Sequence, residues 1–435
     1  MINDGEIRQV HLVVFVHGLW GNPNHLKYLV NLFTHFHGDK LHLLNAKCNV
    51  SDYTYDGVDV CGKRLVGEIK EELKSIKEMN IKITKFSIIG YSLGGLVSRY
   101  AIGLLYSQGF FKYIEPIVCI RREDNTKWIK FVNWTSSNLL SKTGEQLQYI
   151  DKFEGDEPLL YVISKPDTVY YKALESFKYR KIYANARRDN SVPFWTAAIT
   201  DVNPFDKYNE LNIVTNEKCV DIIESISLLA NPEENYLIHK STMKLVPYYA
   251  LIFISLPVLV PIGSTILLST LPTHLFKSKR RIQQEKMREE GEEHKEREIY
   301  RDELIEEINT IVTNVEENVF ETAMNLKNFV DSSALDISTR EENSSLSSEE
   351  QCPPDHKHGT QIRLSNFTTS PLFPKLAISK AQHDSFLNLN KLQLDKVVVC
   401  MDHALNSHAS IIVRGSFYNE GKELLKLYVE EIFQP

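Results

Sequence analysis

The chain has 435 residues, which is long enough for two domains or for one large domain with insertions. A hydrophobic fraction of 43% can supply a sizeable core, and a net charge of -7 argues against a nucleic-acid-binding protein. The six cysteines follow no CxxC or metal-ligand spacing, so we expect free thiols in a reducing compartment and no metal site.

The first apolar segment predicts a strand that leads into a functional turn. The preceding residues are polar and acidic, without the basic region of a signal peptide, so we expect no secretion. Residues His11–Val16 are apolar and β-branched almost throughout, which predicts a buried strand. A His-Gly pair follows, where serine hydrolases place half of an oxyanion hole, so we expect the Leu19 N–H to be one donor. For His17 itself, packing in the turn is at least as good an interpretation.

The next elements alternate between helix and strand. Apolar residues at helical spacing predict helices over Asn24–Thr34 and Gly62–Met79, and Leu41–Leu44 predicts a short strand between them. The Gly- and Asp-containing residues Asp56–Cys61 are expected to form a loop before the second helix. With the strand and helix that follow, this order predicts a parallel sheet with helices on both faces, the core of an α/β-hydrolase fold.

The stretch Phe86–Leu96 has the order strand, sharp turn, helix, with the helix continuing to about Tyr106. Its turn reads Gly-Tyr-Ser-Leu-Gly, the pattern of a nucleophile elbow, although an ordinary glycine-rich turn is the alternative. In an elbow the serine is strained and lies at the positive end of the helix, and the glycines leave room for it. We therefore predict Ser92 as the nucleophile and the Leu93 N–H as the second oxyanion donor.

The acid of a catalytic triad is expected after the serine in this fold. Residues Lys181–Asn185 predict a strand, and Asp189 lies just past its carboxyl end, where ligands bind to parallel sheets. The alternative is that Asp189 pairs with Arg187 or Arg188, or forms an Asx turn. Weaker candidates for the acid are Asp167, Asp201 and Asp206.

The histidine is expected after the last buried strand, which Lys396–Cys400 predicts. His403 and His408 both follow that strand, in a segment that should reach back over Ser92. A neutral imidazole with a pKa of about 6.5 can accept the serine proton, while a carboxylate on its other side fixes the tautomer. Residues Gly421–Phe433 predict a closing amphipathic helix.

A long insertion separates the acid from the histidine. Residues Leu245–Phe276 contain no Asp, Glu, Lys or Arg, and basic residues flank both ends. The stretch exceeds the ~20 residues of a membrane span but is broken by four prolines. Because the positive charges are symmetric, we expect a kinked hairpin that enters one leaflet of a membrane or a lipid-droplet monolayer; a buried helix pair is the alternative.

The expected organisation follows from these segments. The hydrolase core occupies residues 1–215 and 361–435, a helical insertion occupies 216–330, with the hairpin at 245–276 and a charged helix at 278–327, and a disordered linker occupies 331–360.

Five segments resemble the fungal serine-esterase (lipase) family of α/β-hydrolases, which includes lipid-droplet phospholipases. They are HLVVFVHGLWGNPNHL (11–26), FSIIGYSLGGLVSRYAIG (86–103), LLSKTGEQL (139–147), KIYANARRDNSVPFWTAAI (181–199) and HALNSHASIIVR (403–414). The resemblance implies a lipid acyl hydrolase at a membrane or droplet surface, and it favours Asp189 and His408 over their alternatives. The chain departs from the family after Pro116, where the Thr-Pro-His-Gly-type turn is absent.

Together these features predict a serine hydrolase that cleaves carboxylic esters of glycerophospholipids or acylglycerols. It would need no metal or organic cofactor, would bind no nucleic acid, and would work on a lipid droplet or the cytosolic face of the endoplasmic reticulum. Two alternatives remain. The absent turn suggests a catalytically impaired scaffold bound to lipid surfaces, and an acyl-protein thioesterase would use the same triad.

Overall fold

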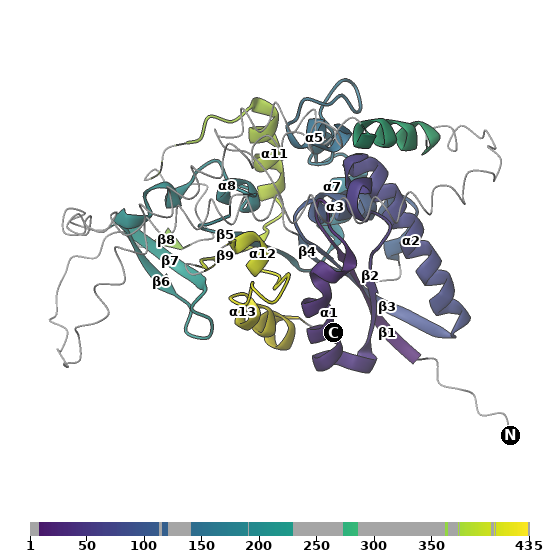
Figure 1. Ribbon diagram of the computed structural model, residues 1–435, viewed down its shortest axis with the longest axis horizontal. Coiled ribbons are helices and arrows are strands. Elements are labelled where there is room, and N and C mark those ends of the chain that lie inside the picture. Colours follow the sequence, from purple (N-terminus) through teal and green to yellow (C-terminus); the bar gives the residue numbers. More distant parts are fainter. Residues whose placement is uncertain are drawn as a thin grey trace, which may run out of the picture.

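One mixed sheet carries the fold in the computed structural model (Figure 1). Its strands are β1 (Arg8–Val16), β2 (Leu41–Asn45), β3 (Ile81–Gly90), β4 (Glu115–Ile120), β5 (Arg180–Asn185), β6 (Leu211–Thr215), β7 (Ile222–Leu228), β8 (Ile362–Arg363) and β9 (Asp395–Val399). They follow the order β2-β1-β3-β4-β5-β9-β7-β6, with β8 paired to β7. The pairs from β2 to β9 are parallel, and β7 is antiparallel to β9, β6 and β8.

Helices connect and cover these strands. They are α1 (Lys27–His37), α2 (Val58–Glu78), α3 (Leu93–Ser107), α5 (Ser141–Leu147), α6 (Leu159–Val162), α7 (Val169–Ser176), α8 (Phe194–Ala197), α11 (Lys380–Asn390), α12 (Ser407–Ser410) and α13 (Lys422–Leu427), with a further helix at 273–285. Short 3-10 turns include η1 (Pro23–Leu26) and η3 (Ser51–Tyr55), and the π-helical turn η10 (Tyr428–Ile432) extends α13. The structure describes residues 8–112, 115–120, 141–189, 191–228, 273–285, 362–363, 373, 375–401, 404 and 406–433.

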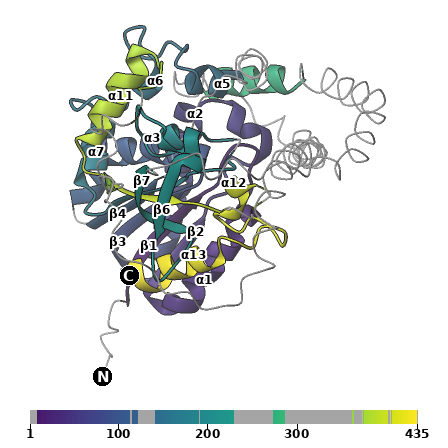
Figure 2. The ribbon, with the colours of Figure 1, turned by 90° about the vertical axis from the view of Figure 1, so that its left-hand side faces the viewer.

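Both faces of the sheet are buried, which explains why β1 is apolar without alternation. Leu12 and Val14 face the core formed with α2, α3 and α7, whereas Val13 and Phe15 face the core formed with α1 and α13. Each of these four side chains is 0% exposed. Figure 2 shows α1 and α13 on one side of the sheet and α2, α3 and α7 on the other.

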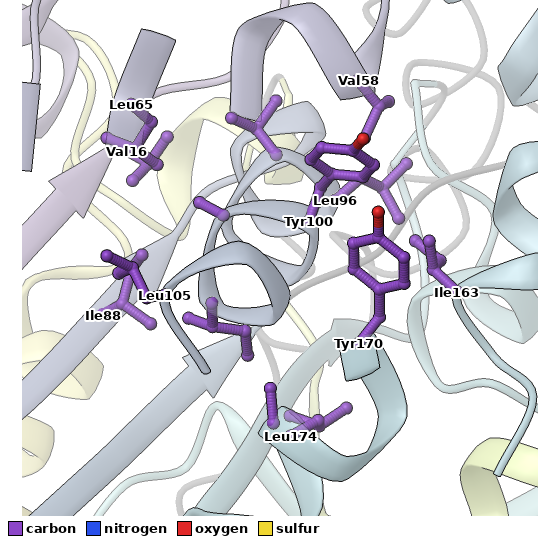
Figure 3. Close-up of a cluster of buried hydrophobic side chains, with 14 of the residues drawn as sticks. Val16, Val58, Leu65, Ile88, Leu96, Tyr100, Leu105, Ile163, Tyr170 and Leu174 are labelled. Atoms are coloured by element: carbon purple, nitrogen blue, oxygen red, sulfur yellow. The ribbon is translucent and has the colours of Figure 1, made fainter. Parts of the chain in front are cut away.

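Helix α3 forms the centre of the larger core (Figure 3). Its Leu96 and Tyr100 lie between Val58 of α2 and Tyr170 of α7, as the close-up shows. The rings of Tyr100 and Tyr170 stack with their centroids 4.8 Å apart. This packing holds the helix that follows the predicted elbow firmly against its neighbours, so the elbow has a rigid support.

The strands predicted on both sides of the insertion are confirmed. Strands β5 and β9 match the predicted ones to within a residue at each end and lie side by side, with Lys181 opposite Asp395 and Asn185 opposite Val399. Strand β4 occupies the position between β3 and β5, so the departure from the family after Pro116 leaves the sheet continuous there. Residues 121–140 lie outside the described part of the chain.

The loop predicted over Asp56–Cys61 is wrong from Val58 onward, because α2 begins there. The boundary is Gly57, whose φ of +106° suits glycine and ends the preceding turn. Val58, Cys61 and Leu65 then bury one helical face, so the apolar periodicity starts one turn earlier than expected.

The sheet also continues past residue 215, where the first part of the core was expected to end, because β7 pairs with β9. Of the predicted hairpin and charged helix, the structure describes residues 273–285, which are helical; the remainder of both and the predicted linker lie outside the described residues. Among the helices that the structure describes, none combines the length and the apolar character needed to cross a membrane.

Candidate active site

Ser92 occupies the turn between β3 and α3 with φ 54° and ψ -127°, a strained backbone conformation for a residue with a side chain. Two glycines permit this turn. A Cβ on Gly90 would lie 2.5 Å from Cα of Gly95, and a Cβ on Gly94 would lie 2.2 Å from the carbonyl oxygen of Val16. The backbone of the turn therefore packs directly on its own helix and on the end of β1, as a nucleophile elbow requires.

We expect Gly94→Ala to destabilise the fold by about 3 kcal/mol, the upper end of the usual overpacking cost, because the obstructing atom belongs to the backbone. Gly67→Ala is the matched control, since Gly67 lies in α2 with open space around its Cβ position. That change should stabilise the helix by about 0.5–1 kcal/mol. Urea denaturation checks both values, and equal midpoints for the two variants would contradict the close approach at Gly94.

Asp189 follows β5 and uses both oxygens of its carboxylate. Oδ1 accepts backbone N–H bonds from Ser191 at 3.2 Å and Val192 at 2.7 Å, which is an Asx-type turn. Oδ2 accepts from Nδ2 of Asn185 at 2.9 Å and lies 3.1 Å from Nδ1 of His408. The Asx turn and the contact with a histidine are thus compatible, because different oxygens make them.

His408 lies in α12, and its backbone is fixed by local capping. The side chain of Asn406 accepts hydrogen bonds from the N–H groups of His408 and Ala409 at 3.0 and 3.3 Å. The Ser407 hydroxyl donates to the carbonyl of Arg187 at 2.8 Å, which joins α12 to the loop that carries Asp189. The imidazole is held on a rigid turn beside its carboxylate.

Tyr91 places His408 next to the elbow. Its hydroxyl donates to the backbone carbonyl of His408 at 3.0 Å, and the two rings lie 4.9 Å apart. The side chain of His408 forms a direct hydrogen bond to Asp189.

The loop that carries Leu19 lies against the serine. A Cβ on Gly18 would be 2.8 Å from Cβ and 3.2 Å from Oγ of Ser92. Leu93 is the first residue of α3, where N–H groups have no acceptor within the helix. His17 is buried with Nδ1 3.1 Å from the carbonyl of Gly18, and burial lowers the pKa of its imidazole, which favours its role in turn packing.

The other candidates lie elsewhere or outside the described residues. Asp201 pairs with Lys375 at 3.3 Å, and Asp206 accepts from the amide of Asn203. Asp189 is the carboxylate that contacts His408 in the described part of the chain. His403 lies outside that part. Nor do the described residues contain a group of three or more His, Cys, Asp or Glu able to hold a metal ion.

Tyr91 and Asn185 are not conspicuous in the sequence, although both fix the histidine–aspartate pair. The one signal for Tyr91 is its place before the serine in the elbow motif, and the one signal for Asn185 is its place at the end of a strand before Asp189. The Tyr91–His408 contact joins segments that only the folded sheet brings together, whereas Asn185 contacts Asp189 within one strand end and its loop.

A serine in a nucleophile elbow, beside a histidine–aspartate pair at the carboxyl ends of parallel strands, is the arrangement of serine hydrolases. The mixed sheet with helices on both faces is compatible with an α/β-hydrolase fold. Residues 6–201 match the family described as "Putative serine esterase (DUF676)", so this part of the chain is similar to that family. The matched part includes Ser92 and Asp189, and His408 lies beyond it.

Curated relatives come from yeasts. The chain is 30% identical over 242 residues to "Putative lipase ROG1" of Saccharomyces cerevisiae, covering 52% of this chain and 34% of that relative. It is 28% identical over 224 residues to "Putative lipase YDL109C" of the same yeast, covering 48% and 33%. It is 28% identical over 217 residues to "Putative lipase C4A8.10" of Schizosaccharomyces pombe, covering 46% and 27%. The matching part thus spans about a third or less of these relatives.

Proposed function

We propose that this protein is a carboxylic ester hydrolase that acts on lipids through Ser92, His408 and Asp189. The observation that carries the proposal is the 3.1 Å contact between Nδ1 of His408 and Oδ2 of Asp189, made beside the strained elbow serine. With Nδ1–H donating to the carboxylate, Nε2 is the ring nitrogen left to accept a proton from the serine.

The reaction then runs in two halves. Ser92 Oγ attacks the ester carbonyl carbon while Nε2 of His408 takes the hydroxyl proton. The negative oxygen of the tetrahedral intermediate accepts hydrogen bonds that the N–H groups of Leu19 and Leu93 donate. The intermediate collapses, the bond to the alcohol oxygen breaks, and His408 returns the proton to the departing alcohol. Water then attacks the carbonyl carbon of the acyl-enzyme while Nε2 of His408 takes a proton from it. The bond to Ser92 Oγ breaks, His408 returns the proton to that oxygen, and the carboxylic acid is released.

The proposed substrates are glycerophospholipids or acylglycerols. Two observations support them: the curated relatives are named as lipases, and residues 245–276 form an uncharged stretch with basic residues on both sides. The same stretch supports a place on a lipid droplet or on the cytosolic face of the endoplasmic reticulum. The purified protein can be assayed on a panel of glycerophospholipids, acylglycerols and an acylated protein. Hydrolysis of either lipid class would support the proposal, whereas hydrolysis of the thioester alone would favour an acyl-protein thioesterase.

Deletion of residues 245–272 tests the lipid-surface part of the proposal and leaves the described helix at 273–285 in place. The deleted form should move to the soluble fraction. Its activity on lipid emulsions should fall about 10- to 100-fold, because anchoring raises the local concentration of the site at the surface. Its activity on a short soluble ester should be unchanged. A deleted form that stays membrane-bound, or that loses both activities equally, would refute this role of the stretch.

A further inference from the structure

The helix at 273–285 is attached to the body of the protein by a partly buried arginine, Arg281. The Arg281 guanidinium donates to both carboxylate oxygens of Asp56, at 2.8 and 2.9 Å. It also donates to the carboxylate and to the backbone carbonyl of Asp52, each at 3.0 Å. Four hydrogen bonds from one planar group fix both its distance and its orientation, which a lysine ammonium cannot do.

This ion cluster is shielded from water. The side chains of Asp56 and Asp52 are 0% and 5% exposed, and that of Arg281 is 16% exposed. Burial alone would raise the pKa of Asp52, but His274 and Arg281 outweigh it and lower that pKa to about 2. Arg64 of α2 adds a second cation 2.8 Å from Asp56. Arg281 is therefore the counterion shared by Asp52 and Asp56.

Asp52 and Asp56 lie in and directly after η3, and η3 holds the loop of the proposed oxyanion hole. Oγ1 of Thr54 accepts from the backbone N–H of Trp20 at 3.2 Å, and the Tyr55 hydroxyl accepts from the Trp20 indole at 2.5 Å. The Ser51 N–H donates to the carbonyl of Gly21 at 3.0 Å. Trp20 has a φ of +53°, so its backbone is strained and depends on these contacts.

The contacts form a continuous path from Arg281 to the reaction centre. Arg281 fixes η3, η3 fixes Trp20, and Trp20 directly follows Leu19, whose N–H is the proposed oxyanion donor. The preceding residue, Gly18, approaches Ser92 as closely as a glycine allows. We propose that Arg281 is a positioning residue that sets the oxyanion hole through η3, an inference that rests on the proposed ester hydrolysis.

The test compares Arg281→Gln and Arg281→Lys with Lys279→Ala, an exposed cation on the same helix, in the full-length protein. On a short soluble ester, Arg281→Gln should lower kcat about 10- to 100-fold with little change in KM, since displacing one oxyanion donor weakens binding of the transition state. A trifluoromethyl ketone, which forms a hemiketal with the serine, should lose affinity in the same proportion. Arg281→Lys should recover part of both, and Lys279→Ala should match the wild type.

Arg281→Gln removes a positive charge that is paired with two buried aspartates, and this loss can destabilise the fold. Circular dichroism and thermal melting therefore establish whether each variant is folded. If Arg281→Gln fails to fold, the test uses Arg281→Lys and Thr54→Val instead. Arg281→Lys keeps the charge but loses the planar set of hydrogen bonds, and Thr54→Val removes the acceptor for the Trp20 N–H. Both should lower kcat and inhibitor affinity, and their effects should combine less than additively, since both act on one loop.

Folded Arg281→Gln or Arg281→Lys with wild-type kcat and inhibitor affinity would overturn the inference while the proposed function stands. A variant with a raised KM and a lowered melting temperature, but with unchanged inhibitor affinity, would also overturn the inference. That result would show a merely structural role for Arg281. A wild-type protein that neither hydrolyses esters nor reacts with a fluorophosphonate would instead defeat the proposed function.

Discussion

Replacement of Ser92 by alanine is expected to lower kcat for ester hydrolysis by about 10⁶-fold, because no other group can form the acyl-enzyme. The same variant should lose all labelling by a fluorophosphonate, which bonds to the activated serine oxygen. The fold should be retained, since alanine meets the same backbone strain at this position and its smaller side chain fits the buried space. Thermal melting verifies that point.

Ser98→Ala is the matched control, because Ser98 is a fully buried serine in α3, the helix that follows Ser92. It should keep both labelling and turnover. Persistent labelling of Ser92→Ala would remove Ser92 as the nucleophile. A wild-type protein without labelling and without turnover of any ester would favour the alternative of a non-catalytic scaffold on a lipid surface.

The second large effect concerns the acid. Asp189→Asn should lower kcat by about 10⁴-fold, because the new amide would hold His408 in the tautomer that cannot accept the serine proton. The structure fixes which way the new amide must face. The N–H groups of Ser191 and Val192 require an acceptor at the Oδ1 position, so we expect the amide oxygen there and the NH₂ facing His408, with the Asn185 amide turned so that its oxygen accepts from the new NH₂. Nδ1 then accepts a hydrogen bond, Nε2 carries the proton, and the imidazole cannot take the serine proton.

Asp201→Asn provides the comparison, since Asp201 is a weaker candidate that pairs with Lys375. Its kcat on a short ester should stay within a few-fold of the wild type. Fluorophosphonate labelling of Asp189→Asn should be slow but complete, because the serine remains. Full activity in Asp189→Asn together with inactivity in Asp201→Asn would transfer the acid role to Asp201.

The strands and the elbow could be predicted from the sequence because their signals are local. β1 and β9 each contain a short run of apolar, mostly β-branched residues, and the Gly-Tyr-Ser-Leu-Gly turn carries its own geometry. The antiparallel strands β6 and β7 could not be predicted in the same way. They are half exposed and partly polar, so their burial depends on the partner strand and not on their own composition.

The supports of the site lie beyond the reach of local patterns. Tyr91 and His408 are 317 positions apart, and Arg281 and Asp52 are 229 positions apart. Nothing in the spacing of these residues indicates that they meet, because the sheet and its connections decide it. A motif therefore indicates which residue reacts, whereas the fold decides which residues hold it in place.

Strand β9, which leads to His408, lies between β5 and β7, both of which belong to the part of the chain before residue 229. It pairs with a strand on each side, with Tyr183 of β5 opposite Val397 and Ile223 of β7 opposite Val398. A protease cut between residues 229 and 361 would thus yield two fragments that stay associated by strand pairing. Asp189 and His408, 219 positions apart, would then meet across a non-covalent interface, and the nicked molecule would be a two-chain enzyme.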